Sequence, residues 1–541
     1  MLIICAISTI TTYSQSKLWT KVSEDKMILL EKFERANMPF QYELFNVNFS
    51  AMKALLSKAP LDSEGKTSNL VIDFPDYNGK LSKYTIYEAP VMEKGLSDKF
   101  PEIKSYIGVG LDDKTATIRF STTLFGLHVM MISGEAETYY IDTYTKDLNN
   151  YIVYNRNNIS NSRSFSCLVE DDAEEIVTSE NLQRATDGKF RQYRLAMACT
   201  IEYAAYHVNA AGLNSGTLTQ KKAAVLSAMT VTMTRVNGIY EKDMSLRMNL
   251  IANNDLIIFI TSDNFSNANA TALIAESQTE IDAAIGFSNY DIGHTVSTGG
   301  GGLASLNSPC TSGKARGITG SSAPVGDPYD VDYVAHEMGH QFGGPHTFNG
   351  TGGSCTGNRS AADAVEPGSG TTIMAYAGIC SGVNVQSNSD AYFHTVSIAK
   401  MTTFMTGTGN CAAQANNNNT PPTIAPLTNY TIPFGTAFIL KGNGSDIDGN
   451  ASLTYCWEQT NPGTSTATAT TTSTNSPNFR SLNPKSTPNR YMPVFSEVMA
   501  GNLAPTWEVI PNVARTMNFA LTVRDNQTPN GGQTARANMN T

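Results

Sequence analysis

The segment that most constrains the fold of this 541-residue chain is residues 333–346, with the sequence YVAHEMGHQFGGPH. It holds His336, His340 and His346, three of the seven histidines in the chain. The first two are four residues apart, so on a helix they share one face about 6 Å apart, and two imidazoles can close around one ion. Gly343 can take a positive φ at low cost, so the helix can end there and the chain can turn back to bring in the third histidine.

The spacing H-E-x-x-H-x-x-G-x-x-H predicts a catalytic zinc site. Three neutral imidazoles leave a fourth coordination position for a water molecule, whose pKa zinc lowers toward about 7. Glu337, next to the first histidine, would take the proton of that water and deliver it to the leaving amine of a peptide bond. The alternative is a core helix whose histidines occur by chance, but five fixed positions seldom coincide by accident.

A second motif, TTIMAYAG at residues 371–378, follows the histidines. Met374 would supply a soft apolar floor beneath the metal. Tyr376 could approach the metal or donate its hydroxyl to the oxyanion of a tetrahedral intermediate. A Met-x-Tyr sequence on its own is more often part of a core, and for Tyr376 both interpretations stay open.

Together with residues 299–320, these motifs resemble the reprolysin-like branch of the metzincins, zinc metallopeptidases found among secreted bacterial proteins. Upstream segments are similar to the propeptide of such enzymes, at residues 42–60, 89–92, 100–110 and 139–142. The resemblance implies an α/β metzincin catalytic domain that cleaves protein or peptide substrates. Thr347, where animal reprolysins usually have Asp, and Tyr376 look more like the pappalysin branch, so the subfamily stays open.

A reprolysin-type propeptide implies a zymogen that is activated by cleavage between about residues 168 and 190. Cys167 is a candidate latency residue, because its thiolate could occupy the position of the water on the metal. Its surroundings, SFSCL, do not match the usual cysteine-switch motif. Asp171 could serve instead, and a structural or disulfide role for Cys167 stays open.

The resemblance in spacing also implies two disulfides, Cys310–Cys411 and Cys355–Cys380. In metzincins an antiparallel edge strand before the zinc helix binds the substrate backbone by strand addition, and residues 291–306 stand at that place here. An extended substrate held in this way implies endopeptidase action.

Five parts of the chain differ in pattern. Short strand-like runs come first, followed by alternating strand-like and helix-like runs, including a strand-like run at 257–261. After the polar stretch AQANNNNTPP the strand-like runs return. We therefore expect a signal peptide at 1–16, a β-rich propeptide at 17–185, a metzincin domain at 186–412, a linker at 413–422 and a truncated immunoglobulin-like β-sandwich at 423–541.

A formal net charge of −10, without basic runs interleaved with aromatics, argues against a nucleic-acid partner. The apolar start of the chain predicts export, to the medium or the cell surface, and no later run reaches the roughly 20 apolar residues of a transmembrane helix. Residues 446–450, DIDGN, could bind a structural calcium ion, although we favour an ordinary turn.

These patterns predict a secreted zinc endopeptidase that is made as a zymogen. A pappalysin-like peptidase of narrower specificity is an alternative of the same class, which a calcium requirement would favour. A catalytically inactive exported adhesin or carbohydrate-binding protein, acting through its sandwich, is an alternative of another class. The intact Glu337 argues against that second alternative.

Overall fold

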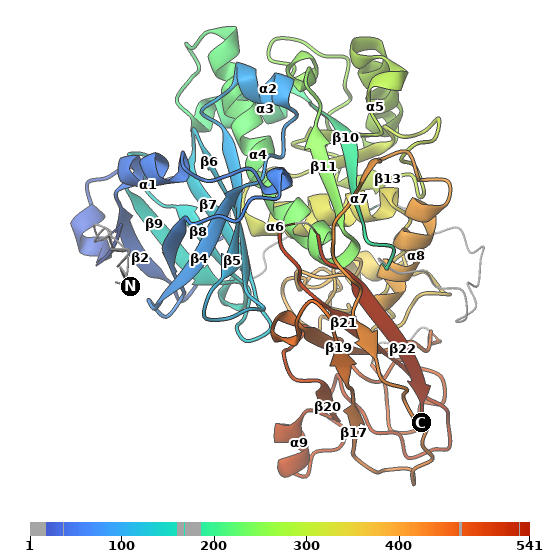
Figure 1. Ribbon diagram of the computed structural model, residues 1–541. Helices are drawn as coiled ribbons and strands as arrows, with labels where there is room; N and C mark the ends of the chain where they lie inside the picture. Colours follow the sequence, from blue (N-terminus) through green and yellow to red (C-terminus); the bar gives the residue numbers. More distant parts are fainter. Residues whose placement is uncertain (1–17, 36, 160–166, 168–185, 465–467, 530) are drawn as a thin grey trace, which may run out of the picture.

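The computed structural model in Figure 1 describes residues 18–541 with the exception of 36, 160–166, 168–185, 465–467 and 530. The predicted signal peptide, Asp171 and most of the expected cleavage region lie outside the described residues. The described chain forms three units in sequence order: an N-terminal sheet, a central α/β unit and a C-terminal β-rich unit. Within these described units, no helix is both long and apolar enough to cross a membrane.

The N-terminal unit is a barrel-like antiparallel sheet of nine strands, in the order β1-β2-β9-β8-β7-β6-β5-β4-β3. The helices α1 (Phe49–Leu56) and α2 (Lys94–Lys99) connect some of its strands. The strands are β1 Trp19–Val22, β2 Glu43–Val47, β3 Val71–Pro75, β4 Leu81–Glu88, β5 Lys104–Gly110, β6 Thr117–Thr123, β7 Gly126–Ile132, β8 Tyr139–Thr143 and β9 Asn150–Asn155. The β-rich unit predicted before residue 185 is therefore present.

Both faces of this sheet are buried, as β7 illustrates. Because successive side chains of a strand point to opposite faces, Val129 and Met131 pack into the sheet's own core. Met130 and Ile132 face the other way, into the core shared with the central unit. The N-terminal sheet is thus packed against the rest of the molecule through an apolar face.

The central unit contains a mixed sheet in the order β11-β10-β12-β14-β13, with β15 also paired to β10. Only β13 and β15 run antiparallel to their neighbours. The strands are β10 Lys189–Cys199, β11 Leu246–Leu250, β12 Ile292–Ser297, β13 Gly302–Ala304, β14 Gly317–Gly320 and β15 Ala413–Asn416. The helices are α3 Ile201–Ala210, α4 Leu218–Met244, α5 Ala270–Ile285, α6 Asp327–Tyr329, α7 Ala335–Gln341 and α8 Thr395–Thr406.

The long helix α4 lies between the N-terminal sheet and the central sheet (Figure 1), and it packs against β6 and β11. Thr217 and Gln220 form a reciprocal capping box that satisfies backbone donors at its first turn. From Ala223 to Met244 nearly every residue is buried. A helix that is buried all round is expected where two layers cover it from opposite sides.

Two expectations for the central unit were wrong. Residues 257–261 do not form a strand: Asn254–Ile257 is a 3-10 helix, and Ile258 makes only an isolated bridge to Cys199. The Asn254 side chain bonds to both the N–H and the carbonyl of Met197, at 2.8 and 3.0 Å, in place of a strand partner. Part of the expected linker, Ala413–Asn416, is a strand, because backbone pairing on an exposed edge needs no apolar pattern.

The C-terminal unit is β-rich, but its strands form three small sheets and an immunoglobulin-like sandwich is not established. The elements are β16 Thr423–Ile424, β17 Phe438–Lys441, β18 Gly444–Ser445, β19 Thr454–Gln459, β20 Asn489–Met492, α9 Phe495–Met499, β21 Asn518–Arg524 and β22 Thr534–Asn540. The 446–450 segment forms a turn in which the Asp446 carboxylate accepts a bond from the N–H of Asp448. Calcium binding there stays a prediction.

A buried ion pair ties the C-terminal unit to the central unit. The Arg524 guanidinium lies 2.8 Å from the Asp243 carboxylate, and both side chains are fully buried. Arg524 also donates to the carbonyl of Phe393 at 3.0 Å. Because Asp243 belongs to α4, this helix contacts all three units of the described chain.

Candidate metal centre

The three predicted metal ligands converge as the sequence spacing requires. His336 and His340 lie on α7, with ring centroids 4.6 Å apart. After the helix, Gly343 has a φ of +91°, and a Cβ there would stand 2.2 Å from a side-chain oxygen of Asn307. The position therefore requires glycine, and the turn it permits brings His346 back beside the helix.

Backbone carbonyls set the orientation of two imidazoles. Nδ1 of His336 donates to the carbonyl of Ile373, and Nδ1 of His340 donates to that of Gly344, each at 2.7 Å. Since a carbonyl only accepts, the proton sits on Nδ1 and the lone pair on Nε2 points inward. Nε2 of His340 lies 3.0 Å from Nε2 of His336 and of His346.

Facing lone pairs at this distance repel one another unless a cation lies between them. Tetrahedral zinc with Zn–N bonds of about 2.0–2.1 Å holds its nitrogens about 3.3–3.4 Å apart, close to the separations here. The residues present therefore fit a zinc ion.

Cys167 completes the cluster. Its sulfur lies 3.6 Å from Nε2 of His340, and the ligand atoms of the four residues all lie within 4.8 Å of one another. The side chain is fully buried. Sequence reasoning left its role open, and the structure places it at the metal position; both disulfides are formed by other cysteines.

The backbone of Cys167 lies against the edge of the central sheet, where it forms a parallel bridge with Gly302 of β13. The predicted edge segment 291–306 divides into two strands. β12 is an interior strand between β10 and β14, and only β13 is at the edge. The edge position expected for a substrate strand is therefore contacted by Cys167.

Glu337 is buried beside the histidines. Burial raises the pKa of its carboxyl to about 8, and the adjacent Cys167 opposes this rise. Apart from that contact, neither carboxylate oxygen accepts a hydrogen bond within the described part of the chain. A carboxylate left in this way at a metal site has its acceptor atoms available for a water molecule.

Met374, the methionine of the predicted turn, lies against α7. A Cβ on Gly339 of α7 would stand 2.4 Å from the sulfur of Met374, so the sulfur packs directly against the backbone of the helix. The ring of Tyr376 lies 4.7 Å from that of His346, measured between centroids. Its hydroxyl donates to the carbonyl of Cys167 at 3.4 Å.

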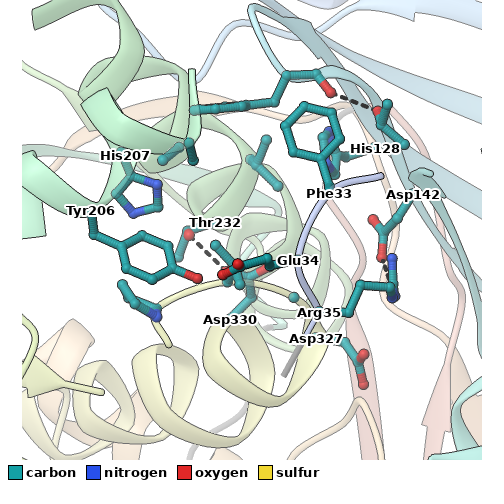
Figure 2. A pocket seen from close by; sticks show the side chains of 18 of the residues that line it. Phe33, Glu34, Arg35, His128, Asp142, Tyr206, His207, Thr232, Asp327 and Asp330 are labelled. Carbon is teal, nitrogen blue, oxygen red and sulfur yellow. Dashed lines mark hydrogen bonds and ion pairs between the residues drawn. The ribbon is translucent and has the colours of Figure 1, made fainter. Parts of the chain in front are cut away.

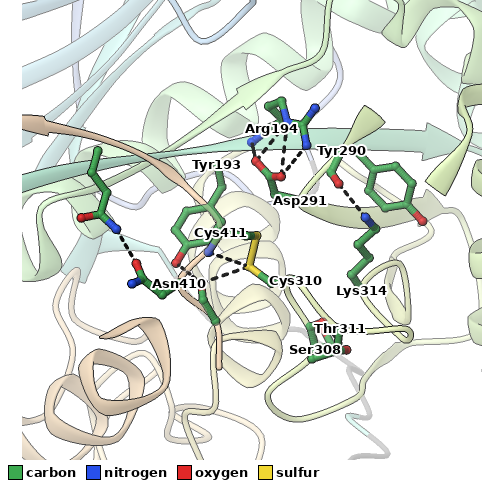
Figure 3. Close-up of a disulfide and its surroundings, with 12 residues drawn as sticks. Tyr193, Arg194, Tyr290, Asp291, Ser308, Cys310, Thr311, Lys314, Asn410 and Cys411 are labelled. Atoms are coloured by element: carbon green, nitrogen blue, oxygen red, sulfur yellow. Dashed lines mark hydrogen bonds and ion pairs between the residues drawn. A yellow bond between two sulfur atoms is a disulfide. The ribbon is translucent and has the colours of Figure 1, made fainter. Parts of the chain in front are cut away.

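Both predicted disulfides are present. Cys310 pairs with Cys411, with Cα atoms 5.7 Å apart, and Cys355 pairs with Cys380 at 5.2 Å. Figure 3 shows the first, which joins the loop after β13 to the segment before β15. It fixes the sheet edge that Cys167 contacts relative to the end of the central unit.

A large cavity in the described chain is remote from the three histidines of the metal cluster. It measures about 270 Å³ and lies between the N-terminal sheet and the central unit (Figure 2). Its walls include His128, Asp142, His207, Thr232 and Asp330. By contrast, the cavity beside the metal cluster, lined by His336 and Tyr376 among others, holds only about 10 Å³.

Sequence reasoning missed two groups of residues. One is a cluster of buried ion pairs at the wall of the large cavity, in which Arg235 contacts both Asp142 and Asp330. The other is Glu366, a buried carboxylate next to the metal site that accepts a bond from the hydroxyl of Thr347. A single Glu in a loop carries no periodic signal, and the unusual residue at 347 was the only hint.

Comparison with protein families agrees with this geometry. Residues 226–347 match the family described as Metallo-peptidase family M12B Reprolysin-like. This part of the chain is a reprolysin-like metallopeptidase domain. The match begins inside α4 and ends one residue after His346, so it includes all three histidines of the cluster.

Other comparisons add little to the metallopeptidase assignment. No curated protein matches the chain. A solved structure titled "Structure of a chaperone-substrate complex" shares 13% sequence identity over 51% of this chain and 40% of that chain. Its TM-score of 0.21 is too low to indicate a shared fold.

Proposed function

We propose that this chain is a secreted zinc-dependent endopeptidase of the reprolysin-like type, made as a zymogen. The observation that carries the proposal is the convergence of three Nε2 atoms 3.0 Å apart beside a buried glutamate, inside a metallopeptidase domain. Two disulfides support an exported protein, since such bonds persist mainly in oxidising compartments.

In this proposal His336, His340 and His346 hold the metal. Bound zinc supplies a Lewis acid that polarises the scissile carbonyl and acidifies the attacking water. Glu337 accepts a proton from that water and returns it to the leaving amine. Once Cys167 has left, the hydroxyl of Tyr376 donates to the oxyanion, while β13 pairs with the substrate backbone.

Latency is assigned to Cys167. Its thiolate would take the fourth position on the metal, and its bridge to Gly302 keeps β13 from pairing with a substrate. Cleavage between about residues 168 and 190 would cut the chain shortly after Cys167. Because the thiol and the backbone block two different parts of the site, each contact strengthens the other.

The deciding experiment nicks the full chain by limited proteolysis, separates the released N-terminal piece, and compares the product with a Glu337→Ala variant treated in the same way. The substrate is casein, and zinc content is measured in both proteins. General acid–base catalysis is worth about 10²–10⁴-fold in rate, so the variant should lose at least that lower factor while keeping its zinc. Equal inactivity of two folded, zinc-loaded proteins would overturn the peptidase proposal and favour an exported binding protein.

A further inference from the structure

Glu366 lies in the loop between the third histidine and the methionine turn, and it is fully buried. Its backbone is paired with the histidine loop. The N–H of Glu366 donates to the carbonyl of Thr347 at 2.9 Å, and its own carbonyl accepts from the N–H of Asn349 at 2.8 Å. The side chain is thereby directed between two segments that support metal ligands.

The carboxylate collects donors from both segments. On one side, Oε1 accepts the hydroxyl of Thr347 at 2.7 Å. On the other, Oε2 accepts the backbone N–H of Thr371 at 2.8 Å and that of Thr372 at 3.3 Å. The hydroxyl of Thr372 also donates to Oε1. No Lys or Arg in the described part of the chain forms an ion pair with Glu366, so neutral donors alone satisfy its charge.

Each of these segments is adjacent in the chain either to a metal ligand or to a residue that hydrogen-bonds to a metal ligand. Thr347 directly follows His346, and its N–H donates to the carbonyl of Met374 at 3.1 Å. Thr372 directly precedes Ile373, whose carbonyl holds Nδ1 of His336 at 2.7 Å. The bonds of one carboxylate therefore connect the loop that carries the third ligand with the carbonyl that orients the first.

We infer that Glu366 is a positioning residue that fixes His346 relative to His336, so that the metal site keeps its shape. Hydrogen bonds behind the ligands orient imidazoles, and their loss typically lowers metal affinity about 10–100-fold. A carboxylate is required here because both oxygens must accept. Gln would put an amide N–H₂ in place of one acceptor, facing a donor. The inference rests on the proposed zinc function.

The experiment measures zinc affinity by competition with a chromogenic chelator on the full chain. The variants are Glu366→Gln and Thr347→Val, with Thr347→Ser as the conservative partner that keeps the hydroxyl. Asp363→Asn is a matched control, because Asp363 is also buried in this loop but accepts from Ser360 and Lys400. Melting of the zinc-free proteins separates loss of affinity from loss of fold.

We expect Glu366→Gln to lower zinc affinity about 10–100-fold, and Thr347→Val to lower it in the same direction. Thr347→Ser and Asp363→Asn should stay near wild type. Excess zinc should restore casein cleavage by Glu366→Gln after nicking, with KM unchanged, whereas it should not rescue Glu337→Ala. A merely structural role would lower melting temperature in both loop-carboxylate variants and leave affinity intact.

Unchanged zinc affinity in Glu366→Gln overturns the inference, whatever happens to activity. If that variant does not fold, Thr347→Val decides, because it leaves the bonds from Thr371 and Thr372 in place. A wild-type chain that binds no zinc overturns the proposed function itself. Nicked wild-type protein that has been separated from its N-terminal piece, binds zinc and still cleaves nothing overturns the peptidase proposal alone.

Discussion

The metal cluster and the interface beneath the N-terminal sheet solve similar problems with different chemistry. At the metal cluster, neutral imidazoles are oriented by carbonyls at 2.7 Å, and little empty volume remains. At the interface, Arg235 sits between Asp142 and Asp330 at the wall of a cavity of about 270 Å³. The histidine cluster is suited to bind a metal ion, whereas at the interface the positive charge is the guanidinium of Arg235 itself.

This difference indicates which perturbations each region resists. A site that needs a metal loses function when its geometry shifts slightly, even if the fold survives. Removing one residue from an interface of buried ion pairs strongly lowers the free energy of unfolding, because the remaining charge is buried without its partner. Substitutions at the two regions should therefore separate catalysis from stability.

The largest stability effect should come from Arg235→Ala. Arg235 is 1% exposed, and its removal would take from the buried Asp330 the cation it contacts and leave Asp142 with Arg35 alone. Breaking such a pair costs about 3–5 kcal/mol of unfolding free energy. Denaturant unfolding should show this loss, while Lys94→Ala, at an exposed pair with Asp98, should cost only about 0.3–0.5 kcal/mol. A parallel loss of zinc affinity would show that the two regions are not separable.

A smaller effect is expected for Cys167→Ser in the uncleaved chain. Serine keeps the size of the side chain but is a poorer metal ligand than a thiolate, so the inhibitory contact of residue 167 with the metal should weaken. Each 1.4 kcal/mol of lost contact corresponds to tenfold, and we expect basal casein cleavage to rise by about that factor. The nicked variant should match nicked wild type, which controls for damage to the site. No rise before cleavage would assign latency to the backbone contact with Gly302 instead.

The smallest effect concerns acid. Burial lowers the pKa of His207, a wall residue of the large cavity, to about 3. A folded-state pKa below the unfolded value of about 6.5 contributes stability above pH 6.5, and this contribution is lost as pH falls toward 3. Over the first unit of that fall, from pH 6.5 to 5.5, the unfolding free energy should therefore drop by about 1 kcal/mol. In His207→Leu the slope of stability against pH should be shallower; an unchanged slope would assign the acid sensitivity to other groups.

Features written in one continuous stretch of sequence were predictable. The zinc helix and its glycine turn follow from spacing within a few turns of chain, and the two disulfides follow from family resemblance. The strand predicted at 257–261 is absent because long-range side-chain bonds of Asn254 take the place of strand pairing. The periodicity of a sequence carries no information on such bonds. The roles of Glu366 and Arg235 could not be predicted for the same reason, since the residues they contact lie in distant segments of the sequence.

The burial of α4 has a consequence for the timing of the activation proposed above. The same buried helix is covered by the N-terminal sheet on one side and by the central sheet on the other, so both sheets pack against it. Hydrolysis of the connecting chain removes a covalent link but leaves that helix covered. Nicking and departure of the N-terminal piece are then separate events, and the lifetime of the cut complex, rather than the act of cutting, sets how quickly the site opens.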